Sequence, residues 1–136
     1  MDRPTGKKEL DIHPDKLRYS SYAVLTGMGL VILTHLIRPN LTGDKSVINF
    51  IFGVLPNFGG AFALPFIFMI MFQSKISRIN FSVKTTFFLS VSITLFVLIL
   101  WEFLQFIIWN YPVDIYDLIM TLAGVLSAVI YFIVLL

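Results

Sequence analysis

The chain has 136 residues, of which 57% are hydrophobic and 13% are charged. Soluble domains carry about 25% charged residues, so water is not the main solvent of this protein. The formal net charge is only +2, and the basic residues are spread over loops rather than gathered in one stripe, so nucleic-acid binding has no support. The sequence contains no cysteine, which excludes disulfides, thiolate metal sites and thiol catalysis.

Apolar residues run almost unbroken through four stretches, each near the ~20 residues that cross ~30 Å of hydrocarbon as an α-helix. The fold class predicted is therefore all-α: a polytopic membrane protein with four transmembrane helices in one domain, residues 19–136, after a polar tail, residues 1–18. The predicted spans are residues 19–37, 47–72, 85–109 and 115–136.

The second span is interrupted by residues that weaken a helix. Pro56 lies in its middle, Gly59 and Gly60 follow, and Pro65 comes one turn later. Proline removes a backbone donor, and a break at membrane depth is tolerated only where protein or a wet cavity surrounds it. The second helix is expected to be kinked or broken at Pro56, Gly59 and Gly60, and a re-entrant half-helix is an alternative.

The loop charges predict the orientation, because Lys and Arg near the ends of spans are retained on the cytoplasmic side. With four spans, the tail and the middle loop share one side of the membrane, and the other side carries only Arg38 and Lys45. Both termini are therefore expected in the cytoplasm. The shared side holds Arg3, Lys7, Lys8, Lys16, Arg18, Lys75, Arg78 and Lys84.

Glu102 is an acidic residue inside the third span. A charge there costs at least ~2.5 kcal/mol on insertion scales, which makes it a functional-site hypothesis by default. It lies seven residues before Trp109, or roughly 10 Å below the outer interface. Gln105 is one turn further out on the same face, so this polar face is expected to point at other helices.

Two further acids, Asp114 and Asp117, follow the turn at Pro112. Continuing their face of the fourth span reaches Thr121, Gly124 and Ala128, which are small enough to let helices approach closely. Spans three and four are therefore expected to pack together. Their polar residues would then converge near the outer surface: Glu102, Gln105, Asp114 and Asp117.

Simpler interpretations stand beside this one. Asp114 and Asp117 are also suited to cap the N-terminus of a helix, and Glu102 could serve only to hold helices together. Arg38, His35 and Asn57 reach the same outer region if the second span bends at Pro56. Singly, His35 and Arg38 also fit a satisfied interfacial pair, and Asn57 fits a turn residue. The spacing of Ala23 and Gly27, like that of Gly124 and Ala128, indicates helix packing.

No motif for a known chemistry is present. The sequence lacks a P-loop and a nucleophile elbow, and its two histidines, His13 and His35, are too few and scattered for a metal cage. Neither a metal nor a cofactor is predicted. An enzyme acting on lipid-linked substrates, with Glu102 as acid or base, is a weaker alternative because no nucleophile accompanies the acid.

The polar residues of the last third of the chain resemble the signature of the VanZ-like family of small bacterial membrane proteins. The matching pattern is Glu102-x-x-Gln105, then Asp114-x-x-Asp117, then Gly124. The chain departs from that pattern at Tyr111, Thr121 and Ala128, where the family has Arg, Asn and Gly. The loss of the Arg removes the natural counter-ion of the acids. The resemblance implies a bacterial inner-membrane protein associated with resistance to glycopeptide antibiotics, especially teicoplanin.

Two functions of different classes follow. In the leading one, an outward-facing acidic pocket binds an antibiotic, a lipid headgroup or a cation at the envelope surface. Its residues would be Glu102, Gln105, Asp114, Asp117, Arg38 and Asn57, with Gly124, Pro56 and Pro112 in structural roles. In the other, the chain is a structural or accessory subunit of a larger membrane complex, or a homo-oligomer, and the polar residues only join helices. Membrane lipids are partners in both.

Overall fold

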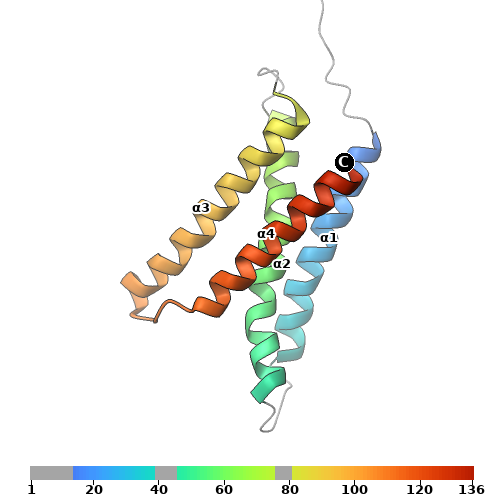
Figure 1. Ribbon diagram of the computed structural model, residues 1–136. Helices are drawn as coiled ribbons and strands as arrows, with labels where there is room; N and C mark the ends of the chain where they lie inside the picture. Colours follow the sequence, from blue (N-terminus) through green and yellow to red (C-terminus); the bar gives the residue numbers. More distant parts are fainter. Residues whose placement is uncertain (1–13, 39–45, 76–80) are drawn as a thin grey trace, which may run out of the picture.

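The computed structural model describes residues 14–38, 46–75 and 81–136. These residues form four α-helices and no strand, as Figure 1 shows. The helices are α1 (Pro14–Ile37), α2 (Ser46–Lys75), α3 (Val83–Trp109) and α4 (Ile115–Leu135). Each is long and apolar enough to cross a bilayer. The prediction of an all-α, multi-pass membrane protein is confirmed.

The start of α1 differs from the expected span. The helix begins at Pro14 rather than near Tyr19, so that residues 14–18, assigned to the polar tail, are its first turn and a half. Proline is favoured at a helix start because its missing N–H would have no partner there. Asp15 and Arg18 are exposed and Lys16 is half-buried in this added segment.

Helix α2 is continuous over 30 residues although Pro56 and Pro65 lie inside it. At ~1.5 Å per residue such a helix is about 45 Å long, which exceeds the hydrocarbon thickness. The expected break at Pro56, Gly59 and Gly60 is therefore wrong, and so is the re-entrant half-helix. Neighbouring helices and local adjustments can satisfy the carbonyls that a proline leaves free. A bend at Pro56 stays a prediction.

Helix α2 is the central element, and α1 packs along it through facing small residues (Figure 1). A Cβ added at Gly27 would lie 2.6 Å from the carbonyl oxygen of Gly59 and 2.7 Å from the Cβ of Ala63. A Cβ added at Gly59 would lie 2.7 Å from the carbonyl oxygen of Gly27. Only glycine permits this mutual approach, so the packing role predicted for Gly27 is confirmed.

Helix α4 also packs on α2. A Cβ at Gly124 would clash with the carbonyl oxygen of Phe58 and lie 2.9 Å from the Cβ of Ala61, and both residues belong to α2. Gly124 is thus a packing residue, as expected, but its predicted partner, the third span, is wrong. Helices α3 and α4 make few contacts with each other. The reason is that α2 offers the small surface, at Ala61, that a glycine face needs.

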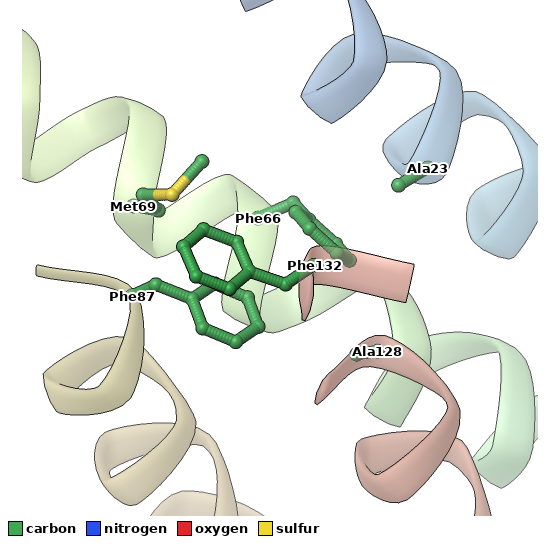
Figure 2. Close-up of a cluster of buried hydrophobic side chains, with 6 residues drawn as sticks. All are labelled: Ala23, Phe66, Met69, Phe87, Ala128 and Phe132. Atoms are coloured by element: carbon green, nitrogen blue, oxygen red, sulfur yellow. The ribbon is translucent and has the colours of Figure 1, made fainter. Parts of the chain in front are cut away.

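An aromatic cluster joins α2, α3 and α4 at one end of the bundle (Figure 2). Phe87 of α3 and Phe132 of α4 stack with centroids 3.9 Å apart and planes within 2°, and Phe66 of α2 lies 5.3 Å from Phe87. Met69, Ala23 and Ala128 complete this buried group. From there α3 leans away from α1 and α2 toward its C-terminal end (Figure 1).

Helix α1 begins and helix α4 ends at the same end of the bundle. The hydroxyl of Tyr131, near the end of α4, donates a hydrogen bond of 3.1 Å to the carbonyl oxygen of Tyr19, near the start of α1. Figure 1 shows the C-terminus beside the first turns of α1. We call this the terminal end; the opposite end, with the turn between α3 and α4, is the turn end.

Candidate functional site

The turn between α3 and α4 is built by residues that end one helix and start the next. Asn110 caps α3 in the left-handed conformation (φ 58°), and its N–H donates to the carbonyl of Phe106. Asparagine tolerates this conformation better than other residues with a Cβ. Asp114 caps α4, and its carboxylate accepts a hydrogen bond of 2.8 Å from the N–H of Tyr116. Pro112 lies between these two caps.

The interpretation of Asp114 as a helix cap is thereby confirmed, and the geometry adds a second property. Its carboxylate lies close enough to act electrostatically on both Glu102 and Asp117. The turn therefore places a fixed negative charge beside the two acids that lie deeper in their helices.

Glu102 is the buried acid of the site. Its side chain is only 9% exposed, whereas Phe103 and Trp101 on either side are about half exposed. The face of α3 that carries Glu102 thus points at the protein, as the sequence predicts. Within the described part of the chain, the charged groups that act on its carboxylate are Asp117 and Asp114, and both repel it.

Asp117 has partners that partly offset this repulsion. Asn57, in the middle of α2, donates a side-chain hydrogen bond to the carboxylate, and Arg38, directly after α1, attracts it. The approach of Arg38 and Asn57 to the acids, expected from the sequence only if α2 bends at Pro56, is thus present. Asp117 is half-buried, so it lies between the buried Glu102 and the surface of the turn end.

Three carboxylates from α3 and α4 therefore share one neighbourhood with one guanidinium and one amide. The set is Glu102, Asp114, Asp117, Arg38 and Asn57, which we call the acidic cluster. With all side chains ionised its net charge is −2, since three negative charges face one positive charge. An uncompensated charge is costly away from water, so the cluster favours an approaching cation or hydrogen-bond donor.

Other residues at the turn end have smaller roles. Gln105 is half-buried on the face of Glu102, as its spacing predicts. The Nδ1–H of His35 donates to the carbonyl of Val31, one turn earlier in α1, at 2.9 Å, so this nitrogen is already engaged within its own helix. Tyr116 packs edge-on against Phe50 with centroids 5.0 Å apart, which fixes the start of α4 on α2.

A polar face of α3 escaped the sequence analysis. Thr86, Ser90 and Thr94 follow one another at intervals of four residues, and all three are buried. Thr86 and Ser90 donate to carbonyls one turn earlier, but the hydroxyl of Thr94 has no partner among the described residues. The four-residue spacing of these residues is visible in the sequence. It is a weak signal, because serine and threonine are common in membrane helices and their hydroxyls usually bond to carbonyls of the same helix.

The cluster is not arranged as a metal cage. Within residues 14–38, 46–75 and 81–136, no group of three His, Asp or Glu side chains is placed to hold one metal ion. The arrangement can attract a cationic group by charge and accept hydrogen bonds from it. In comparisons with known proteins, no family model, curated protein or solved structure matches this chain.

Proposed function

We propose that this chain is a VanZ-like bacterial inner-membrane protein whose acidic cluster faces outward and binds a cationic or polar group at the envelope surface. The resemblance of Glu102-x-x-Gln105, Asp114-x-x-Asp117 and Gly124 to the family pattern suggests a glycopeptide of the teicoplanin type as the ligand. A lipid headgroup or a free cation has the same chemistry.

One observation supports the proposal above the others. Glu102 is buried, yet the charged groups that act on it are the two like charges of Asp117 and Asp114. A residue that only joined helices would be expected to face a donor or a cation, because an unpaired buried acid destabilises the bundle. An acid with no such partner among the described residues is better explained by a ligand that supplies the positive charge.

The outward orientation rests on the loop charges. Eight Lys and Arg residues lie in the tail, in the middle loop or at the span ends beside them, against two on the side of the turn end. By the positive-inside rule both termini lie in the cytoplasm, and the turn end with its acidic cluster faces outward. Trp109 and Tyr111 are half exposed or more there, as aromatic residues at a membrane interface are.

The test is a pair of charge-removing variants, Glu102→Gln and Asp117→Asn, in a susceptible bacterium that expresses the chain. We expect each to lower both teicoplanin tolerance and teicoplanin binding by the purified protein, with affinity falling about tenfold or more, since hydrogen bonds to charged groups contribute ~1.5–3 kcal/mol. Asp15→Asn, an exposed acid at the terminal end, is the control. Unchanged tolerance and binding at equal membrane abundance would refute the proposal.

A second function, an accessory subunit of a larger membrane complex, is favoured by a different observation. Gly29 of α1 and Gly53 and Gly60 of α2 face open space, where an added Cβ meets nothing. Small residues on a lipid-facing surface let another helix approach closely. Purification in mild detergent distinguishes the two functions: a co-purifying protein lost in Gly60→Leu supports the subunit, and a monomer or homo-oligomer alone counts against it.

A further inference from the structure

A groove of about 350 Å³ lies between α1 and α2 in the half of the bundle nearest the terminal end. Its lining is apolar apart from one hydroxyl, and that hydroxyl, of Ser21, donates to the carbonyl of Leu17. The lining residues are Ser21, Val24 and Leu25 of α1 and Ile67, Ile70 and Met71 of α2. Because both helices span the membrane, the groove runs along the region that lipid acyl chains occupy.

Arg18 is not among the lining residues of the groove, but helical spacing places it next to them. It precedes Ser21 by three residues and Leu25 by seven, so the three side chains share one face of α1. Leu25 is therefore about 10 Å deeper than Arg18. The arginine is exposed, which places a positive charge at the level of the headgroups and an apolar groove directly beneath it.

The guanidinium of Arg18 is held in place. Its Nε donates a hydrogen bond of 2.8 Å to the hydroxyl of Tyr22, and its carbon lies 5.7 Å from the centre of the Tyr22 ring. Among the described residues, this bond engages the Nε–H alone of the five N–H donors and not the two terminal NH₂ groups, the fork that matches a phosphate. The nearby charge of Asp15 also acts on Arg18 and competes with any anion.

We propose that this groove is a binding site for an anionic phospholipid, with an acyl chain along α1 and α2 and the phosphate on the Arg18 guanidinium. The charge of the site decides between lipid classes. The acyl chain of a zwitterionic lipid can pack in the same groove, but the cation of its headgroup is repelled by Arg18. A lipid with net negative charge is attracted to Arg18 without this opposing repulsion. This site lies at the opposite end of the bundle from the acidic cluster and does not depend on it.

A second groove at the terminal end provides an internal comparison. It measures about 340 Å³, and its lining from α2 and α4 contains no charged side chain: Phe62, Ser127, Ile130, Tyr131, Val134 and Leu135. An acyl chain can lie there as well, but nothing in that lining distinguishes one headgroup from another. Only the groove between α1 and α2 has a basic residue beside it, so selectivity for anionic lipid should depend on Arg18.

The experiment is native mass spectrometry of the purified full chain in detergent, with phosphatidylglycerol and phosphatidylcholine of identical acyl chains added in equal amounts. Arg18→Gln tests the headgroup contact, and Lys84→Gln, an exposed basic residue at the start of α3, is its charge-matched control. Leu25→Trp fills the groove from a side chain that is 68% exposed. Leu33→Trp, exposed on the same helix outside the groove, is its size-matched control.

The wild-type chain should retain phosphatidylglycerol about fivefold over phosphatidylcholine, the ratio that one basic residue near an anionic headgroup provides. Arg18→Gln should bring this ratio close to one while Lys84→Gln keeps it. Leu25→Trp should reduce the binding of both lipids, whereas Leu33→Trp should leave the binding of both unchanged. The proposal is overturned if the wild type shows no preference, if Lys84→Gln loses as much as Arg18→Gln, or if Leu25→Trp binds lipid like Leu33→Trp.

Discussion

The six glycines in the described part of the chain fall into two groups, according to what surrounds their Cα atoms. Gly27, Gly59 and Gly124 lie against backbone of a neighbouring helix, whereas Gly29, Gly53 and Gly60 meet nothing within 4 Å. Lipid is as apolar as the protein interior, so membrane helices associate through close packing rather than through exclusion of water. Single methyl groups at the close glycines should therefore have large effects.

Gly124→Ala should destabilise the bundle by about 2 kcal/mol, because its Cβ would overlap the Phe58 carbonyl and backbone atoms can move only with the whole helix. Thermal unfolding in detergent, followed by size-exclusion chromatography, measures the loss. Gly60→Ala is the matched control on α2, where the added methyl meets nothing and alanine favours helix. Equal unfolding temperatures for the two variants would contradict the packing of α4 on α2.

Asp114 combines a helix cap with a charge in the acidic cluster. Asparagine caps a helix as well as aspartate does, and alanine does not. Asp114→Asn should therefore keep stability and weaken binding of a cationic ligand, while Asp114→Ala should also lose about 1 kcal/mol of stability. Thermal unfolding and ligand titration of both variants separate the two roles. A loss of stability in Asp114→Asn equal to that in Asp114→Ala would show that the cap is not the contact described.

Helix α3 has two different ends. Near its start Phe87 is fully buried against Phe132 and Phe66, and near its end Phe103 and Ile107 are exposed while Glu102 is buried. The aromatic cluster thus attaches α3 to the bundle, and the polar face points inward beyond it. This arrangement leaves Glu102 beside α4 although the two helices touch little.

Phe87→Ala should destabilise the bundle by about 3 kcal/mol, the low end of values for buried phenylalanine, since lipid rather than water competes for the side chain. Phe96→Ala, whose side chain is 68% exposed on the same helix, is the control and should change stability little. Unfolding by denaturing detergent, followed by circular dichroism, gives the comparison. A larger loss in Phe96→Ala would place the aromatic contact on the wrong face of α3.

The sequence predicted the positions of the helices along the chain better than it predicted which helices pack together. Long apolar runs set the spans to within a few residues, because hydrocarbon thickness leaves little choice of length. The break at Pro56 was wrong because a proline's free carbonyl can be satisfied by surrounding helices, which one segment's sequence does not reveal. The partner of Gly124 was wrong because several helices carry small residues, and spacing alone does not tell which pair meets.

In the candidate site too, residues within one helix were easier to predict than contacts between helices. Glu102, Gln105 and Asp117 were found because polar residues in apolar helices stand out, and their inward direction followed from helical spacing. Arg38 and Asn57 were named from the sequence only on the condition of a bend at Pro56, and the packing of α1 and α4 on α2 is what brings them to Asp117. Thr94 was missed because its burial, with no hydrogen-bond partner for its hydroxyl among the described residues, is a property of the folded interior.

As a whole, the interior holds an aromatic cluster and hydroxyl groups at the terminal end and the acidic cluster at the turn end. The two ends are expected on opposite sides of the membrane, with the turn end outside. The chain has no cysteine, so single cysteines can be introduced without background labelling. Val113→Cys and Phe81→Cys, both at exposed positions outside the helices, report the two ends.

A membrane-impermeant maleimide should label Val113→Cys in intact cells and Phe81→Cys only after permeabilisation. The reason is the excess of Lys and Arg beside residue 81 and in the tail. Labelling in the reverse pattern would place the acidic cluster in the cytoplasm and end the proposal of an envelope ligand, while leaving the fold unchanged.

The acidic cluster requires that Glu102 of α3 and Asp117 of α4 lie close together in the folded chain. The most direct measurement is crosslinking of the pair Glu102→Cys and Asp117→Cys by a short bifunctional thiol reagent in native membranes. The pair Ile107→Cys and Ile119→Cys, on exposed faces of the same helices, is the control. We predict an intramolecular crosslink in the first pair and none in the second; no crosslink at 102 and 117, or equal crosslinking of both pairs, would contradict the account.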